Sequence, residues 1–301
     1  MRVFVTGSTG FIGSAVVREL HDNGHRVLGL VRSDAGAAAL AKTGAEVHRG
    51  SLDDLDSLRA GASQADGVIH TAYIHDFADM AAAAATDLAA VNAIGEVLAG
   101  SGRPLVIASG TGALQSDRAS VETDMGDPTD PRSPRMQSEL ALISLASRGV
   151  RTSAVRLPPS VHGEGDAHGL VPILIRTARE KGVSAYPGDG VNHWAAVHRT
   201  DAARVFRLAL ENGEAGRMFH AVGDEGVEVR EIAGEIGRQL GIPVTSVPRG
   251  EEAIAHFGWL GAFFGTDVLV SSALTQEWLG WKPVGPGLVT DLELGHYFGG
   301  K

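Results

Sequence analysis

The stretch that most constrains the fold of this chain is residues 1–20, MRVFVTGSTGFIGSAVVREL. Val3–Val5 form a short run of β-branched and aromatic residues, and glycines follow at positions 7, 10 and 13. After Ile12 the apolar positions recur with the spacing of one helix face, including Val16 and Leu20. The sequence therefore predicts a strand, a glycine turn and a helix in direct succession.

The three glycines each meet a different need of a dinucleotide-binding turn. Gly7 makes the tight turn, Gly10 lets a pyrophosphate approach the backbone, and Gly13 lets the helix and strand pack closely. The helix N-terminus then directs amide groups and a partial positive charge at the phosphates. The motif predicts dinucleotide binding, and the alternative is a glycine-rich turn without a ligand.

The end of the second expected strand, Arg26–Val31, bears on the form of the cofactor. In the NAD-binding version of this unit, an acidic residue about 20 positions past the glycines accepts a hydrogen bond from the ribose. Here Arg32 and Ser33 stand at that place, and both suit a 2′-phosphate. We therefore predict NADP rather than NAD, and the alternative is that Arg32 stacks on the adenine or faces solvent.

Strand and helix patterns alternate through the first half of the chain. Further strands are expected at 45–48, 67–70, 104–109 and 152–157, with helices at 35–43, 76–98 and 136–147 between them. This alternation predicts an α/β fold with a Rossmann-like, doubly wound parallel sheet, whose ligands bind at the carboxyl ends of the strands.

The chain divides into two expected parts. Residues 1–160 form the dinucleotide-binding core, and residues 161–301 form a smaller lobe that covers the substrate and returns elements to the core sheet. The polar, proline-containing segment 115–135 is expected to be a surface excursion beside the site.

The composition of the chain excludes several classes of binding partner and of site. The chain has 26 Lys and Arg against 36 Asp and Glu, a formal net charge of −10, which argues against nucleic acid or an anionic membrane as the main partner. It has no cysteine, so disulfides, thiolate metal sites and a cysteine nucleophile are excluded. The N-terminus begins the first strand directly, and no uninterrupted apolar run reaches the roughly 18–20 residues of a membrane span. We expect a soluble, cytoplasmic protein.

Several motifs together resemble one family. They are TGSTGFIG near the N-terminus, HTA at 70–72, Asn92, RLPPSVHGEG at 156–165 and AVHRTDAARV at 196–205. They resemble the extended and atypical short-chain dehydrogenase/reductases, a group that includes NAD-dependent epimerase/dehydratase-like proteins. The resemblance spans about residues 1–215 and implies a nicotinamide cofactor and oxidoreductase chemistry on a small molecule.

The glycine turn, the residues after the second strand and the resemblance together define the expected cofactor site. Ser51 and Leu52 are expected to edge the adenine, and Thr71 to Tyr73 to meet the nicotinamide ribose. The full set of expected cofactor contacts is Gly7, Thr9, Gly10, Phe11, Ile12, Gly13, Arg32, Ser33, Ser51, Leu52, Thr71, Ala72, Tyr73, Asn92, Ser109, Pro158 and Val161.

The resemblance also implies a catalytic set, from which this chain departs. In the family a Ser or Thr after the fifth strand polarises the substrate oxygen, and Ser109 or Thr111 matches it. The family's proton-donating Tyr and its Lys four residues later lie on the next helix. Aligning that helix on Ser138 puts Arg135 at the tyrosine and Glu139 at the lysine. Arginine stays protonated at any working pH and cannot serve as the usual acid.

Other proton donors therefore have to be considered. Tyr73 follows a strand that faces the cofactor, and histidines titrate near neutral pH. Each of these residues has a packing or substrate-contact alternative. The candidate catalytic residues are Ser109, Thr111, Tyr73, Arg135, His162 and His198. The spacing of His75, His162 and His168 matches no usual metal motif, so no metal is expected.

These observations predict an NADP(H)-dependent oxidoreductase that transfers hydride to a carbonyl or imine of a small molecule. The alternative is a catalytically degenerate NADP-binding sensor or scaffold, and a sugar-nucleotide epimerase or dehydratase is a weaker third option. A homodimer through the helices that contain Asn92 and Met136 is expected from the resemblance. Five aromatic residues are read as a pocket wall or as core: Trp194, Phe257, Trp259, Phe263 and Phe264.

Overall fold

The computed structural model describes residues 1–75, 79–112, 114, 118–130 and 135–299. Within these residues, seven strands form one large parallel sheet in the order β10-β6-β5-β4-β1-β2-β3. They are β1 (Arg2–Thr6), β2 (Arg26–Val31), β3 (Glu46–Arg49), β4 (Gly67–His70), β5 (Pro104–Gly110), β6 (Arg151–Leu157) and β10 (Arg217–His220). The central strands are almost continuous buried apolar runs, as expected for a sheet covered on both faces. The predicted Rossmann-like, doubly wound α/β fold is confirmed.

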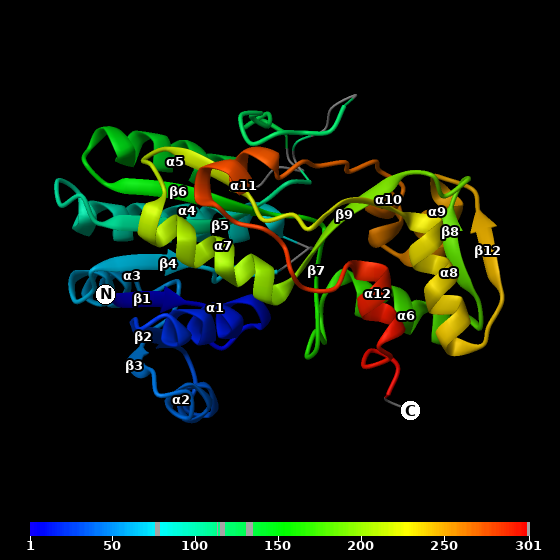
Figure 1. The fold of residues 1–301 in the computed structure, drawn as a ribbon, viewed down its shortest axis with the longest axis horizontal. Helices are drawn as coiled ribbons and strands as arrows, with labels where there is room; N and C mark the ends of the chain where they lie inside the picture. The colour runs from blue at the N-terminus through cyan, green and yellow to red at the C-terminus, as the bar shows by residue number, and fades with distance from the viewer. Residues whose placement is uncertain (76–78, 113, 115–117, 131–134, 300–301) are drawn as a thin grey trace.

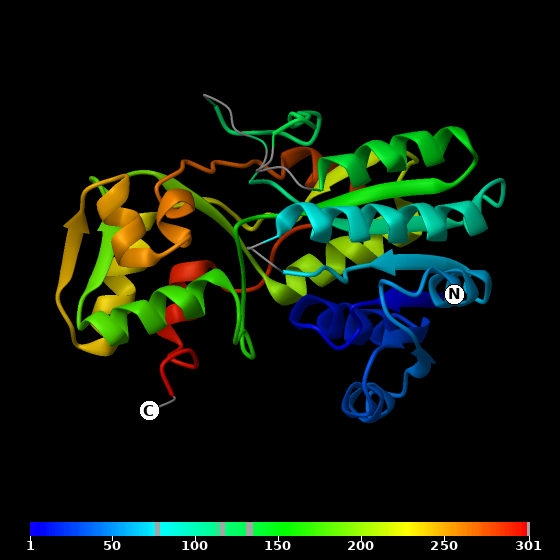
Figure 2. The same cartoon turned by 180° about the vertical axis from the view of Figure 1, so that it is seen from behind.

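Helices cover both faces of this sheet. One face carries α1 (Phe11–Asp22) and α7 (Arg199–Asn212), which lie in front in Figure 1. The other carries α3 (Leu55–Ser63), α4 (Met80–Leu98) and α5 (Met136–Ser147), of which α4 and α5 lie in front in Figure 2. Next to β2 and β3 lies α2 (Asp34–Ala41).

Helix α4 is apolar, and it packs closely against its neighbours. A Cβ on Gly95 would lie 2.3 Å from Leu145 of α5, so a larger residue here would require the Leu145 side chain to move. Among the described helices, α4 is long and apolar enough to cross a membrane by length and composition. Its buried face packs on the sheet between α3 and α5, as in the core helix of a globular domain.

The second lobe has its own apolar core. Its described strands form a three-stranded sheet of β7 (Ser160–His162), β9 (His193–His198) and β11 (Asp224–Glu228), and a pair of β8 (Ser184–Pro187) and β12 (Val244–Val247). The helices around them are α6 (Leu170–Lys181), α8 (Val229–Leu240), α9 (Glu251–Phe257), α10 (Leu260–Phe264) and α12 (Leu288–Glu293).

Three elements from the C-terminal half pack on the core. Helix α7 packs against α1, strand β10 pairs in parallel with β6, and α11 (Ala273–Leu279) packs near both. The sequence pattern also predicts a helix over 288–297, but α12 ends earlier, at Glu293, because Gly295 adopts a left-handed φ of +78°.

The segment 115–135 lies partly outside the described residues. Its described part is attached to the second lobe, since the Ser120 amide donates to the Leu269 carbonyl at 2.9 Å. The first three residues of the predicted helix 76–98 also lie outside the described residues, and Asp79 caps α4 by accepting from the Ala82 amide.

Candidate functional site

The glycine turn forms a tight cradle between β1 and α1. Gly7 has a φ of +69°, and its carbonyl accepts from the Gly10 amide at 2.9 Å. A Cβ on Gly13 would lie 2.0 Å from the Gly7 carbonyl oxygen, and one on Gly7 would lie 2.8 Å from the Ala72 amide. No side chain caps α1, and its first turn carries no acidic residue. The cradle therefore presents free amides to an anion and fits a dinucleotide pyrophosphate.

The end of β2 leaves one cation open to a ligand. Arg32 is exposed and has no hydrogen bond or ion pair with a described residue. The Ser33 hydroxyl caps α2 by accepting from the Gly36 amide at 3.1 Å, which still leaves its proton for a phosphate oxygen. Leu52 is buried and Ser51 half-buried just after β3. The contact of Arg32 with a 2′-phosphate stays a prediction.

Candidate residues from three strand ends meet at one edge of the sheet. His70 lies opposite Ile107 in the β4–β5 pairing, and Gly110 lies opposite Leu157 in the β5–β6 pairing. This register puts Tyr73, Thr111 and Pro158 beyond the ends of neighbouring strands. The Thr111 side chain is fully buried, and its hydroxyl has no hydrogen-bond partner among the described residues. Because buried polar groups are normally hydrogen-bonded, the unpartnered Thr111 hydroxyl is a candidate to bind a ligand at this edge.

A buried hydrogen-bonded chain runs beneath this edge. Thr6 Oγ1 and His70 Nδ1 lie 2.9 Å apart, and His70 Nε2 lies 3.3 Å from Asp87 Oδ1. Asp87 also accepts from the Ser138 hydroxyl at 2.6 Å and from Arg135 Nη2 at 3.1 Å. Burial alone would raise the pKa of Asp87, but Arg135, His70 and Ser138 outweigh it and hold that pKa far below its ordinary value. The carboxylate is therefore ionised and fixes the position of Arg135.

Arg135 and Tyr73, both predicted as site residues, lie in direct contact. The guanidinium carbon of Arg135 is 4.2 Å from the centre of the Tyr73 ring, a cation–π arrangement. Burial raises the pKa of Tyr73; the positive charge of Arg135 opposes this effect and the negative charge of Asp87 adds to it. The Tyr73 hydroxyl is therefore protonated at neutral pH.

Glu139 is committed to the protein core. Its carboxylate and the Arg156 guanidinium are both fully buried, with Nη2 to Oε2 at 2.6 Å and Nε to Oε1 at 3.0 Å. Glu139 is thereby held by β6 rather than left free for a cofactor. A Tyr-x-x-x-Lys spacing does occur in the chain, at Tyr297 and Lys301, but it follows α12 and is not on α5.

His162 and His198 form a separate cluster. Their rings lie 5.6 Å apart edge to face, and His162 Nδ1 lies 2.9 Å from Asp291 Oδ2 of α12. Burial and the neighbouring His162 lower the pKa of His198, whose Nδ1 lies 2.7 Å from the Thr200 hydroxyl. The structure therefore brings these two candidates together with Asp291.

Arg199, at the start of α7, connects this cluster to the glycine cradle. It stacks on Phe11 at 4.3 Å and donates to the Ser14 hydroxyl and the Glu164 carbonyl, both at 2.8 Å. It thus places a cation beside the first turn of α1.

The Asn92 side chain is exposed on α4 between buried neighbours, and its cofactor contact stays a prediction.

The aromatic residues divide into core and site-facing groups. Trp194, Phe257 and Phe264 are buried in the second lobe, and Trp259 is 46% exposed. Phe263 packs on Trp194 with ring centres 5.4 Å apart, and its ring would lie 3.5 Å from a Cβ on Gly112, the residue after Thr111. Phe263 is therefore an aromatic side chain from the second lobe that lies beside the residues following β5.

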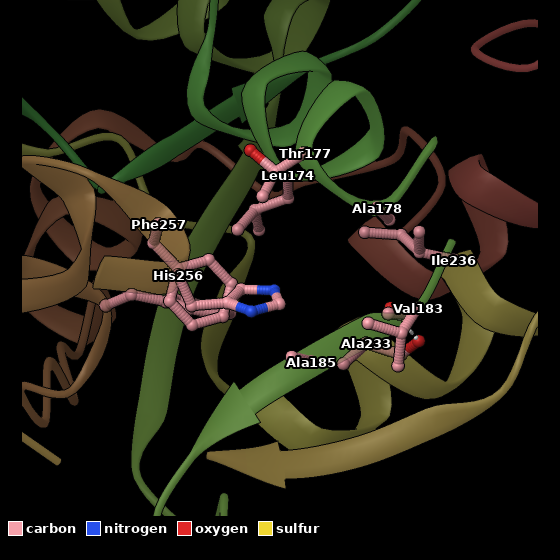
Figure 3. Close-up of a pocket in the computed structure, with 11 residues that line it drawn as sticks. Leu174, Thr177, Ala178, Val183, Ala185, Ala233, Ile236, His256 and Phe257 are labelled. Carbon is pink, nitrogen blue, oxygen red and sulfur yellow. Dashed lines mark hydrogen bonds between the residues drawn. The ribbon is translucent and has the colours of Figure 1, made fainter. Parts of the chain in front are cut away.

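A small cavity lies elsewhere in the second lobe. Figure 3 shows the His256 ring pointing into it, surrounded by side chains that include Leu174, Ala185 and Ile236. Its volume is about 10 Å³, room for roughly one water molecule. This cavity is too small for a substrate.

Among the residues of these arrangements, Asp87 and Asp291 were not predicted from the sequence, whereas His70 and Arg199 lie within the HTA and AVHRTDAARV motifs. One sequence signal could have pointed to Asp87, because it is the single charged residue in the apolar stretch from 80 to 95. Asp291 has no comparable signal, since its partner is 129 residues away.

Comparisons with known proteins agree with this architecture. A family model described as the NAD dependent epimerase/dehydratase family matches residues 3–222. Uncharacterized protein C2A9.02 of Schizosaccharomyces pombe is 51% identical over 298 residues, covering 99% of this chain and 100% of that protein. Uncharacterized protein YLL056C of Saccharomyces cerevisiae is 44% identical, covering 97% and 98%. Among solved structures, DesIV, a dTDP-glucose 4,6-dehydratase from Streptomyces venezuelae with NAD and TYD bound, has a TM-score of 0.78 at 21% identity, covering 97% and 96%.

Proposed function

Because the chain belongs to the NAD dependent epimerase/dehydratase family, we propose that it is an NADP(H)-dependent oxidoreductase that moves hydride between the nicotinamide and the carbonyl or imine carbon of a small molecule. Family membership establishes the nicotinamide dinucleotide and the epimerase/dehydratase type of oxidoreductase. The 2′-phosphate on the cofactor, the carbonyl or imine substrate and the reduction direction are the proposal.

The cofactor contacts follow from the cradle. The amides at the start of α1 would hold the pyrophosphate, and Arg32 would pair with the 2′-phosphate. Arg199 adds a cation beside the same turn. When bound, the nicotinamide supplies or accepts the hydride.

The observation that carries the proposal is the pair of hydroxyls, Tyr73 and Thr111, at the ends of neighbouring strands. A carbonyl that accepts hydride develops negative charge on its oxygen and needs a proton to become an alcohol. Tyr73 is protonated at neutral pH and would donate that proton, while the unpartnered Thr111 hydroxyl would hydrogen-bond the same oxygen. The charge of Arg135 would stabilise the tyrosinate until water returns the proton.

The test is NADPH consumption with panels of carbonyl and imine compounds. Tyr73→Phe should lower kcat by about 10²- to 10⁴-fold with unchanged NADPH affinity. Tyr186→Phe, a tyrosine of β8 in the second lobe, is the matched control and should retain kcat. An unchanged kcat in Tyr73→Phe would remove the tyrosine from the mechanism and direct the search to His162 and His198.

A second candidate function is an NADP-binding sensor without turnover. It is favoured by the burial of Glu139 against Arg156, which leaves α5 without a basic residue at that position for the cofactor. NADPH binding without consumption across all panels, in folded protein, would favour the sensor. The cytoplasmic location expected from the sequence is part of either proposal.

A further inference from the structure

Arg135 has an unmet hydrogen-bonding group in the candidate site. Its Nη2 donates to Asp87, but its Nε is shielded from solvent and has no partner among the described residues. The side chain is 17% exposed, so water reaches only part of it. A buried donor without a partner is costly. The exposed part of the side chain is the part that a ligand oxygen can reach.

Because Arg135 lies beside Tyr73, a substrate group that Arg135 binds would lie near the reacting carbonyl. Its guanidinium covers the ring of Tyr73, which is the proposed proton donor. A substrate atom bound by Arg135 therefore lies close to the oxygen that Tyr73 protonates. This geometry favours an anionic group bonded to the carbonyl carbon or one atom further along.

The local charges distinguish a carboxylate from a phosphate. Arg135 carries one positive charge and Asp87, ionised beside it, carries one negative charge. Burial and the charge of Arg135 lower the pKa of His75, which packs edge-on against Tyr73, so His75 adds no cation at neutral pH. A dianionic phosphate would bring two charges to a site with little net charge, whereas a carboxylate brings only one and can pair with the same guanidinium.

Phe263, beside Gly112, favours an apolar remainder. Phe263 packs on Trp194 and lies against the backbone after Thr111. Its ring offers contact area and no hydrogen-bonding group. The part of the substrate beyond the carbonyl would therefore meet an aromatic wall.

We propose that Arg135 anchors a substrate carboxylate, so that the substrate is an oxo acid with its carboxylate on or next to the carbonyl carbon and an apolar remainder against Phe263. This inference rests on the proposed function and names its substrate class. It assigns Arg135 to substrate binding, with Asp87 as the residue that positions it.

The experiment compares binding of 2-oxo-4-phenylbutanoate and its ethyl ester to protein loaded with NADP⁺, by calorimetry. The parent protein should bind the acid about 10- to 100-fold more tightly than the ester. Arg135→Gln should lose this preference, and Arg135→Lys, which keeps the charge without the planar fork, should retain part of it. Arg148→Gln, at the other end of α5, is the matched control and should keep the full preference. NADP⁺ affinity and thermal unfolding of each variant verify that the site is folded.

Three results with the acid and its ester would overturn the inference. They are equal binding of acid and ester by the parent, no binding of the acid, and an acid preference that survives in Arg135→Gln. Inorganic phosphate is added as a competitor, and displacement of the acid at lower concentration than acetate would mean that the anchor serves a phosphate instead. Binding is measured without turnover, so an acid preference without NADPH consumption would support the carboxylate anchor while rejecting hydride transfer.

Discussion

Replacing Glu139 by leucine is expected to lower the free energy of unfolding by about 3–5 kcal/mol, because it leaves the Arg156 charge unpaired in the core. Both side chains are 0% exposed, and two hydrogen bonds at 2.6 and 3.0 Å join them. Arg156 also donates to the backbone carbonyl of Asp124 at 2.8 Å, which carries no full charge to replace the carboxylate. At roughly 2–4 °C per kcal/mol, the Tm should fall by about 6–20 °C.

Urea unfolding of single and double variants tests this reasoning. Glu139→Leu combined with Arg156→Met removes both charges, and the double variant should recover at least half of the loss. Glu96→Leu, at a half-exposed position on α4, is the control and should change stability by about 0.5 kcal/mol or less. A double variant as unstable as Glu139→Leu would refute the explanation by an unpaired charge.

Three further predictions follow from other parts of the structure. Arg32→Ala should weaken NADP⁺ binding by about 1.5–3 kcal/mol and leave NAD⁺ binding unchanged, and equal NADP⁺ affinities in a titration would contradict its role. Burial lowers the pKa of His220 from 6.5 to about 4, so the unfolded chain takes up this proton first and stability should fall by up to about 3 kcal/mol between pH 6.5 and 4. His220→Asn should flatten that slope in pH-dependent unfolding, and an unchanged slope would exclude His220. Leu140 and Ile143 are 38% and 45% exposed on α5, and we propose that they join two subunits. Light scattering at micromolar concentration should give a dimer and, for Ile143→Glu, a monomer, whereas a monomeric parent would rule out the interface.

The fold was predictable because each of its signals is local. The strand, turn and helix at residues 1–20 and the apolar runs of the central strands are patterns within a few residues of each other. Helix α5 was expected at 136–147, where it lies. The predicted end of the C-terminal helix was wrong, because a single residue, Gly295, ends that helix early.

The candidate site was predictable only in part, because its ion pairs are long-range. Tyr73, Thr111 and Arg135 could be named from strand ends and from the family pattern. The carboxylate that orients Arg135 comes from Asp87, 48 residues away, and no spacing rule relates the two. Likewise, Glu139 is buried in an ion pair with Arg156, which lies on a strand that follows α5.

The place of β10 at the edge of the main sheet matters while the chain is being made. Its partner β6 ends at Leu157, but β10 is complete only at His220. At about 5–20 residues per second, a ribosome needs roughly 3–13 s to make the intervening stretch, and during this time the edge of β6 is open. An unpaired strand edge is a template for pairing with other chains. A product terminated before His220 keeps that edge open permanently and is therefore prone to aggregate.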